Sequence, residues 1–246
     1  MCIYPLGETA ACRHSACLLR QQSLPLIDHP SPEVTHLMLD VPSFQPDGQL
    51  RCGGSLEPIL RMLPADITIL GGNLNTPFLD SYQKFDLLRS EDYLARNAAI
   101  TADCAIRLIG TKMHSTFSDS PALVIGWGRI GKSLAQKLRR LGCSVTVAAR
   151  NPKDQSTLSM LGYSAISIED IPSRLNQFKI LFNTVPHAVL NTSLPDEILA
   201  LELASSPGIP AEFAIDGRGL PERLAPLSSG KLIAETILHF LRRDSL

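Results

Sequence analysis

The sequence lacks any apolar run near the roughly 20 residues that span a bilayer, and it has no internal repeat or low-complexity tract. It also lacks an excess of either charge, since 23 basic and 24 acidic side chains leave a formal net charge of -1. Without a broad basic surface, neither nucleic acid nor an anionic membrane is an expected partner. We therefore expect the chain to act on a small molecule.

Cysteine is sparse and scattered, with six residues in the chain. Cys12 and Cys17 flank His14, but no second cluster completes a tetrahedral metal site, so we predict ordinary reduced thiols and no metal. Glu8 and Arg13 interrupt the apolar residues near the amino terminus, which argues against a secretory signal. A cytoplasmic protein is expected.

Short β-rich segments alternate with segments of helical period, and 246 residues are enough for two cores. The predicted strands are 23–28, 34–40, 66–70, 122–125, 144–148, 178–182 and 199–204, with helices at 55–62, 90–113 and 231–242. We predict an α/β protein of two domains, one small and flavodoxin-like and one an NAD(P)-binding Rossmann domain. The expected parts are an N-terminal α/β domain at 1–92, a helical bridge at 93–118, the Rossmann domain at 119–230, and a closing helix at 231–246 that packs back at the domain junction.

Three glycines follow the four-residue apolar strand at 122–125. Gly126, Gly128 and Gly131 have the spacing G-x-G-x-x-G and open a helical segment that ends at Gly142. The first glycine permits a tight turn, the second lets the backbone approach a pyrophosphate, and the third lets helix and strand pack closely. A helix N-terminus at that point favours an anion. The pattern predicts a dinucleotide site; the alternative is a turn that serves packing alone.

The acidic residue that binds the ribose hydroxyls of NAD, about twenty residues beyond the first glycine, is missing. Ala148, Ala149 and Arg150 occupy this region. An arginine can bind a 2′-phosphate through paired hydrogen bonds, so NADP is favoured over NAD unless Arg150 is merely a solvated loop residue. The expected cofactor contacts are Gly126, Trp127, Gly128, Arg129, Ile130, Gly131, Arg150, Asn151, Lys153, Asn183, Thr184, Val185 and Pro186. Of these, Arg129 is equally well explained as a surface residue.

Further motifs lie on both sides of the glycine turn. They are VTVAARN, FNTVP with the following LN at 190–191, LASSPG at 203–208, GLP at 219–221 with AP at 225–226, and the upstream segments DITILGG and AITAD. With GWGRIGKSLAQKLRRLG, they make the chain similar to the family of the dipicolinate synthase A subunit, the Rossmann component of that enzyme. Two positions depart from the family pattern: Leu227 stands where a lysine is expected, which removes a carboxylate ligand, and Cys104 follows Asp103 where a glycine is expected.

The resemblance implies an NADP-linked oxidation of dihydrodipicolinate, or its hydrated precursor, to the spore dicarboxylate dipicolinate. It also implies a second, flavoprotein-like component of the kind represented by the dipicolinate synthase B subunit, and we leave open a homo-oligomer. Aromatisation after hydride loss is downhill, so the site must mainly position the ring and release a proton.

The catalytic candidates are Thr184, His187, Asp103 and Thr101. Asn183 and Thr184 end a predicted strand, where they either contact the nicotinamide or only stabilise a turn. His187 can exchange protons near neutral pH, or it caps a following helix and faces water. Thr101 and Asp103 either reach the substrate or serve as the N-cap and first turn of a helix. The residues expected to bind the substrate carboxylates are Ser205, Ser206, Gly72, Ser228 and Ser229, the last two before the closing helix; for Gly72, a plain turn is the alternative.

Two other functions remain open. A hydroxyacid dehydrogenase would need an Arg, Glu and His set, and the single histidine after His187 is His239, in the closing helix. A non-catalytic NADP-binding regulatory or scaffold subunit would accommodate the loss at Leu227.

Overall fold

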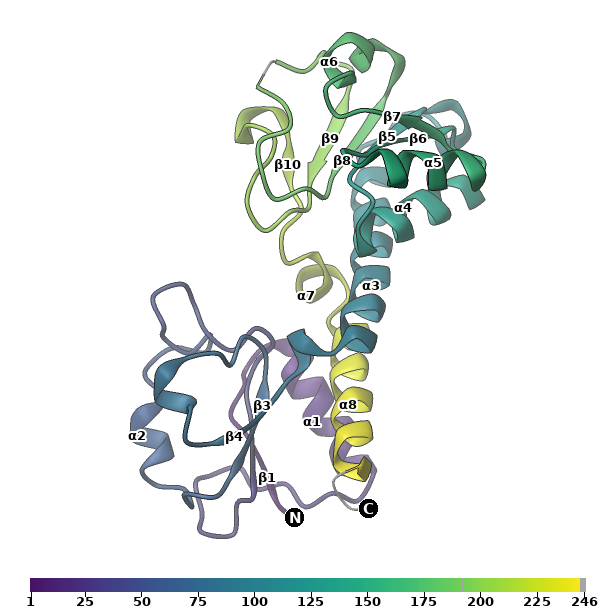
Figure 1. Ribbon diagram of the computed structural model, residues 1–246. Helices are drawn as coiled ribbons and strands as arrows, with labels where there is room; N and C mark the ends of the chain where they lie inside the picture. Colours follow the sequence, from purple (N-terminus) through teal and green to yellow (C-terminus); the bar gives the residue numbers. More distant parts are fainter. Residues whose placement is uncertain (192, 244–246) are drawn as a thin grey trace. The chain divides into compact units, whose positions relative to one another are not determined.

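The computed structural model describes residues 1–191 and 193–243, which form two compact units with a parallel sheet in each (Figure 1). The first unit combines Met1–Asn97 with the chain from Pro221 onward, and the second is Ala98–Leu220. Helix α3 (Glu91–Gly110) begins in the first unit and ends in the second. The predicted α/β class with two parallel sheets is confirmed. No helix in the described part of the chain is long and apolar enough to cross a membrane.

The first sheet has the strand order β1-β2-β3-β4. Its strands are β1 (Ile3–Pro5), β2 (His36–Met38), β3 (Thr68–Gly71) and β4 (Gln83–Asp86). β1 pairs with β2 on one side, and on its other side Ile3 exchanges backbone hydrogen bonds with Pro25 and Ile27, so the first strand lies inside, as in a flavodoxin-like sheet. The pairing starts before the strands themselves, because Thr35 and Cys2 exchange hydrogen bonds through the threonine hydroxyl and backbone.

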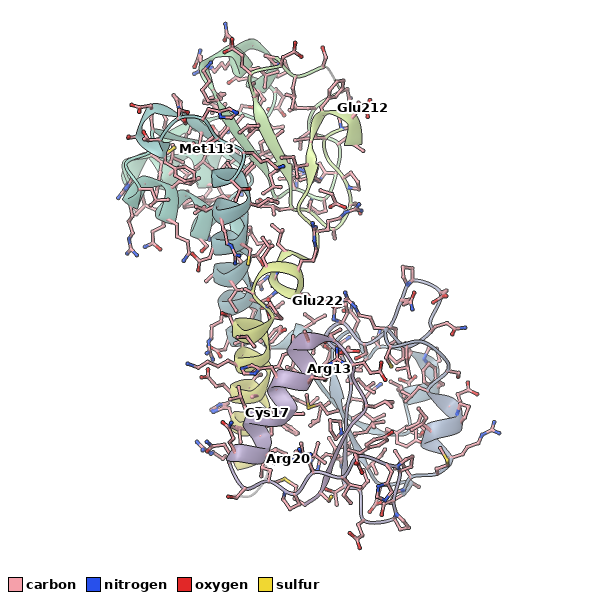
Figure 2. The ribbon with its side chains drawn as sticks, turned by 180° about the vertical axis from the view of Figure 1, so that it is seen from behind. Arg13, Cys17, Arg20, Met113, Glu212 and Glu222 are labelled. Carbon is pink, nitrogen blue, oxygen red and sulfur yellow. The ribbon has the colours of Figure 1, made fainter. Side chains whose placement is uncertain are left out.

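Helices α1 (Ala10–Gln21) and α8 (Pro226–Arg243) lie side by side in the first unit (Figure 1). Gly230 permits this close approach, since a Cβ there would lie 2.5 Å from the carbonyl oxygen of Ala11. Thr9 caps α1, and the buried Asp40 carboxylate holds the cap by accepting a 2.6 Å hydrogen bond from the Thr9 hydroxyl. The outer side of α1 carries Arg13, Cys17 and Arg20 (Figure 2).

A hydrophobic core cluster of the first unit contains aliphatic side chains such as Leu37 and Ile69, which are fully buried and pair in register across β2 and β3. Its shorter elements are α2 (Glu57–Leu60), η1 (Pro77–Leu79) and η2 (Leu87–Arg89).

Two predicted elements of the first unit differ in the structure. The segment 23–28 makes an isolated bridge between Leu26 and Ile3 instead of a strand. The closing helix begins at Pro226, well before the predicted start at 231, because proline fits the first helical turn and Gly230 packs inside the helix. Ser228, Ser229 and Gly230 therefore lie within α8.

The second sheet has six parallel strands in the order β10-β9-β8-β5-β6-β7. They are β5 (Ala122–Ile125), β6 (Val145–Ala148), β7 (Ser164–Ile166), β8 (Ile180–Asn183), β9 (Leu199–Glu202) and β10 (Ile215–Asp216). This is the Rossmann order, with the chain reversing direction across the sheet between β5 and β8. All four residues of β5 are buried, as a central parallel strand requires.

The helices of the second unit include α4, which follows β5, and α5, which follows β6 (Figure 1). Leu134 and Leu138 form the buried side of α4, and Leu158 is the buried residue of α5. The bounds are α4 (Arg129–Arg140), α5 (Pro152–Met160), α6 (Ile171–Arg174), η3 (Phe117–Asp119), η4 (Leu175–Gln177), η5 (Ala211–Phe213) and α7 (Leu220–Leu224), which starts at the end of the unit.

Candidate cofactor site

The glycine turn lies at the carboxyl end of β5, next to the point where the strand order reverses. Strand β6 flanks β5 on one side and β8 on the other, so the chain beyond all three strands meets at this edge of the sheet. Ligands of open α/β sheets bind at such a reversal. The structure thus brings the predicted turn, Arg150 and Thr184 to one edge.

Each glycine of the turn has a separate geometric role. Gly126 has a φ of 101°, in the left-handed region that favours glycine. A methyl group on Gly131 would overlap the carbonyl oxygen of Gly126, so the third glycine is required for the helix to approach the turn. A Cβ on Gly128 would meet nothing within 4 Å, so the chain is open in front of the second glycine. These are the places where a pyrophosphate-binding turn needs space and close packing.

The N-terminus of α4 faces this opening without a side-chain cap. Gly128 is the N-cap residue and offers no side-chain acceptor for the first-turn N–H groups. Arg129 and Ile130 open the helix; Arg129 is exposed and Ile130 half-buried. The exposed donors and the helix dipole make the turn suited to an anion.

The chain after β8 is fastened to the glycine turn. The backbone N–H and the hydroxyl of Thr184 both donate to the carbonyl oxygen of Ile125, at 3.0 and 2.8 Å. A Cβ on Gly126 would lie 2.6 Å from the Thr184 hydroxyl oxygen and 2.8 Å from Cγ2 of Val185. The half-buried Thr184 therefore uses its proton within the protein, and it keeps acceptor capacity on the hydroxyl oxygen.

Trp127, between the first two glycines, packs edge-on to Tyr163 with ring centroids 5.7 Å apart. The Lys132 ammonium lies 5.8 Å from the centroid of the indole. Trp127 is the single tryptophan of the sequence. Its fluorescence therefore reports on the glycine turn without interference from another indole.

Of the residues after β6, Arg150 and Lys153 extend their side chains into solvent, and Asn151 caps a helix. Arg150 is exposed and, within residues 1–191 and 193–243, forms no hydrogen bond or ion pair. Asn151 is the N-cap of α5, and its side-chain oxygen accepts a 2.9 Å hydrogen bond from the backbone N–H of Lys153. The Lys153 side chain is exposed. Arg150 is thus available for a ligand, whereas the Asn151 oxygen already has a partner.

Asn183 has a different position from the one expected. Its side chain is fully buried; Nδ2 donates to both carboxylate oxygens of Glu202, at 2.9 and 2.8 Å, and Oδ1 accepts from the backbone N–H of Val185 at 3.0 Å. With the amide engaged on both sides, Asn183 holds Glu202 and has no group directed to a ligand. Sequence reasoning missed Glu202 altogether, and the available signal was an acid at the end of the apolar strand LALE.

The remaining predicted residues of this sheet edge are exposed in loops. His187 and Pro186 lie after β8, and Ser205 and Ser206 lie after β9. In the described residues between His187 and β9 there is no helix, so the prediction that His187 starts a helical segment is wrong; the chain bends there instead.

Thr101 and Asp103 lie in the middle of α3, so their interpretation as an N-cap and a first turn is wrong. Thr101 is buried with 7% exposure. Asp103 is exposed and forms an ion pair with Lys137 of α4 at 2.7 Å. Since Lys137 is two turns along α4 from the glycine turn, Asp103 is held away from that turn.

The predicted substrate residues of the first unit lie in positions that differ from those expected. Gly72 is buried, and a Cβ there would lie 2.8 Å from a Val41 methyl and 2.9 Å from a Leu88 methyl, so this glycine serves packing. Ser228 and Ser229 lie inside α8, and Ser229 is buried with its hydroxyl unpaired in the described structure. The serines lie in the first turn of α8 and not before the helix, because α8 starts at Pro226.

Three of the cysteines are poor nucleophiles in this structure. Burial raises the pKa of the Cys143 thiol to about 11, and burial together with the Asp103 charge raises the pKa of Cys104. Burial and the nearby Asp40 carboxylate likewise raise the pKa of Cys12. These thiols stay protonated at neutral pH.

Comparison with known proteins supports the dinucleotide interpretation. The model of the D-isomer specific 2-hydroxyacid dehydrogenase NAD binding domain matches residues 100–194. The dipicolinate synthase A subunit of Bacillus subtilis (strain 168) is 27% identical over 168 residues, which are 63% of this chain and 56% of that protein. The aligned region spans little more than half the length of this curated relative.

Two solved structures have the same fold over nearly the whole chain. One is the dipicolinate synthase A subunit from Bacillus halodurans, with a TM-score of 0.81, 19% identity, and coverage of 98% of this chain and 97% of that chain. The other is dipicolinate synthase, A chain, from Bacillus subtilis, with a TM-score of 0.83, 20% identity, and coverage of 99% and 96%. The resemblance predicted from the motifs is confirmed: residues 100–194 match the NAD binding domain model, and the chain is similar to the dipicolinate synthase A subunit in sequence and shares its fold.

Proposed function

We propose that the chain binds NADP at the glycine turn and oxidises dihydrodipicolinate, or its hydrated precursor, to dipicolinate. The observation that carries the proposal is the open turn at Gly128, at the reversal point of a Rossmann sheet, in a chain similar to the dipicolinate synthase A subunit. The uncapped N-terminus of α4 would hold the pyrophosphate through backbone N–H groups.

The preference for NADP over NAD rests on Arg150. It is exposed at the carboxyl end of β6, where NAD sites carry an acid, and its guanidinium has no partner in the described chain. A 2′-phosphate would supply two acceptors to this planar group, and Lys153, in the first turn of α5, would add a second positive charge.

When bound, NADP would be the oxidant and would accept a hydride from the ring carbon. The chain positions the ring and removes a proton. Thr184 offers an acceptor beside the turn, since its own proton is donated to Ile125. His187 is exposed in the loop after β8 and is the proposed proton acceptor. Ser205 and Ser206, exposed after β9, are the proposed donors to a substrate carboxylate.

A flavoprotein-like second subunit is the proposed partner, by analogy with the two-component enzyme that the resemblance implies, and cytoplasm is the proposed location. Asp103 is engaged with Lys137, and Thr101 is buried, so neither of these two candidates from α3 supplements His187 in the described structure. With His187 as the single remaining candidate among these residues, we expect the chain to need a partner for efficient turnover.

A non-catalytic NADP-binding subunit is the second candidate. Leu227, 64% exposed, is the observation that favours it, because an exposed apolar side chain occupies the position where the family pattern has a cation. A hydroxyacid dehydrogenase is less well supported, since its catalytic histidine would have to be His239, which belongs to α8 of the first unit, whereas the glycine turn belongs to the second.

The deciding experiment incubates the purified chain with dihydrodipicolinate and NADP, with and without the companion subunit. Nicotinamide reduction and dipicolinate absorbance are both followed. Turnover that appears when the companion is added supports the proposal. Full turnover by the chain alone would contradict the partner requirement, and binding of NADP without turnover in either mixture would favour the regulatory role.

A further inference from the structure

The Glu202 carboxylate at the end of β9 collects five N–H hydrogen bonds in the interior of the second unit. Its side chain is 5% exposed. Two bonds come from Asn183 Nδ2, and the others come from the backbone N–H groups of Ala204, Gly208 and Ile209, at 2.9, 2.8 and 3.1 Å. The donors of all five bonds are neutral amide groups.

These hydrogen bonds join Asn183, the last residue of β8, to the loop after β9, residues 203–209, and this loop in turn contacts the loop after β8, residues 184–190. Gly208 shows how closely they meet: a Cβ there would lie 2.5 Å from Asn183 Nδ2, 2.6 Å from the His187 carbonyl oxygen and 2.9 Å from the Val185 carbonyl oxygen. The N–H of Val189 also donates to the Gly208 carbonyl oxygen at 2.9 Å. The two loops, residues 184–190 and 203–209, therefore form one hydrogen-bonded layer with Glu202 at its centre.

A carboxylate suits this centre because it accepts hydrogen bonds on both oxygens and donates none. All five groups that face the Glu202 oxygens are N–H donors. A glutamine in its place would therefore direct its N–H₂ group at other N–H groups. A buried donor that loses its acceptor is costly, which means that the loops would rearrange instead of tolerating the mismatch.

The position of the layer in the sheet indicates which part of a dinucleotide it adjoins. A Rossmann sheet consists of two mononucleotide-binding halves on either side of the strand reversal. The glycine turn and Arg150 belong to the half of β5, β6 and β7, whereas the layer lies beyond β8 and β9 in the other half. If the first half holds the adenine ribose and its phosphates, the layer borders the nicotinamide.

We propose that Glu202 is a positioning residue that, through Asn183 and the N–H groups of residues 204–209, holds both loops as the wall of the nicotinamide half. This inference rests on the proposed function, because it assumes that NADP occupies the site. Glu202 would then contribute to the binding of the nicotinamide half of NADP, whereas the glycine turn and Arg150 would bind the adenine half.

The test compares NADPH with ADP-ribose 2′-phosphate, which has the adenine half and the pyrophosphate but no nicotinamide. Both are titrated into native protein and Glu202→Gln, with Trp127 fluorescence as the signal. We expect Glu202→Gln to lower the affinity for NADPH about tenfold, which corresponds to one lost hydrogen bond. The affinity for ADP-ribose 2′-phosphate should stay within about twofold of that of the native protein. Hydrogen exchange at residues 184–190 and 203–209 should accelerate.

Glu212→Gln is the matched control, since Glu212 is an exposed acid of the same unit (Figure 2) and the substitution is chemically the same. Gly208→Ala is the second variant, and it decides the test if Glu202→Gln fails to fold. It keeps the carboxylate but pushes the loops apart, and we expect the same selective loss of NADPH.

The outcomes separate the inference from the function on which it rests. A native chain that binds neither ligand overturns both. A native chain that binds both, with variants that weaken NADPH and the fragment equally or change neither, overturns the role of Glu202 and leaves NADP binding standing.

Discussion

Gly131 lies so close to the carbonyl oxygen of Gly126 that a methyl group on Gly131 would overlap that oxygen. Gly128, between them, has no atom within 4 Å of where its Cβ would be. Two glycines of the same motif therefore differ in what a single methyl group would disturb. The difference allows packing and ligand approach to be tested separately.

Gly131→Ala should destabilise the second unit by about 1 to 3 kcal/mol, because α4 must move away from the turn. Gly128→Ala should leave stability unchanged within about 0.5 kcal/mol but should weaken NADPH, since the methyl group would enter the space predicted for the pyrophosphate. Chemical denaturation and Trp127-based titration give the two quantities. Loss of NADPH binding in Gly131→Ala but none in Gly128→Ala would argue that the turn serves packing alone.

Arg150→Ala should reduce NADPH affinity on the order of ten- to a hundredfold, because it removes a charge-assisted contact with the 2′-phosphate. NADH lacks that phosphate, and its affinity should change little. Titration of both cofactors measures the ratio of the NADPH and NADH affinities. The salt concentration must be fixed, because salt screens part of the contact. Arg140→Ala, an exposed arginine at the far end of α4, is the control. Equal weakening of both cofactors in Arg150→Ala would rule out the NADP assignment.

Cys17 should react first with a thiol reagent at neutral pH. It is exposed on the outer side of α1, whereas burial raises the pKa values of Cys12, Cys104 and Cys143 (Figure 2). Cys17→Ser should therefore remove the fastest phase of modification in the native protein, as followed by mass spectrometry. A fast phase that survives the substitution would mean that another thiol is accessible and reactive.

Cys143 should make the unfolding free energy fall as the pH rises from about 9 to about 11. The native thiol donates to the Ser120 carbonyl oxygen and keeps its proton until its raised pKa of about 11, whereas the unfolded thiol loses its proton near 9.0. The stabilisation is complete below pH 9 and is lost above it. The stability difference between native protein and Cys143→Ala should shrink across this interval. Parallel curves for Cys143→Ala would contradict the raised pKa.

The sequence was sufficient to locate the central strands and the glycine turn, because a buried parallel strand is a continuous apolar run and the turn has a fixed spacing. Strands β1, β4, β7 and β10 are absent from the predicted strands. All four are short, and the last three carry exposed polar residues such as Gln83, Lys84 and Ser164, so neither apolar length nor strict alternation marks them.

The side chains of the site were harder to predict than its backbone. Asn183 ends a strand in the right place, yet it turns inward because a buried carboxylate nineteen positions away in sequence needs its N–H₂ group. Such a pairing depends on the tertiary neighbour across the sheet and leaves no local pattern. The start of α8 was misplaced for a related reason: Gly230 interrupts a helix pattern locally, but the crossing with α1 requires it.

The pairing of α1 with α8 has a consequence for biosynthesis. These two helices come from opposite ends of the sequence, and the whole second unit is encoded between them. A ribosome therefore releases the segment that covers α1 only after the inserted Rossmann unit has emerged, so the inserted unit can fold before the first one is complete. Until then the face of α1 that carries Ala11 lacks the helix that covers it in the folded protein.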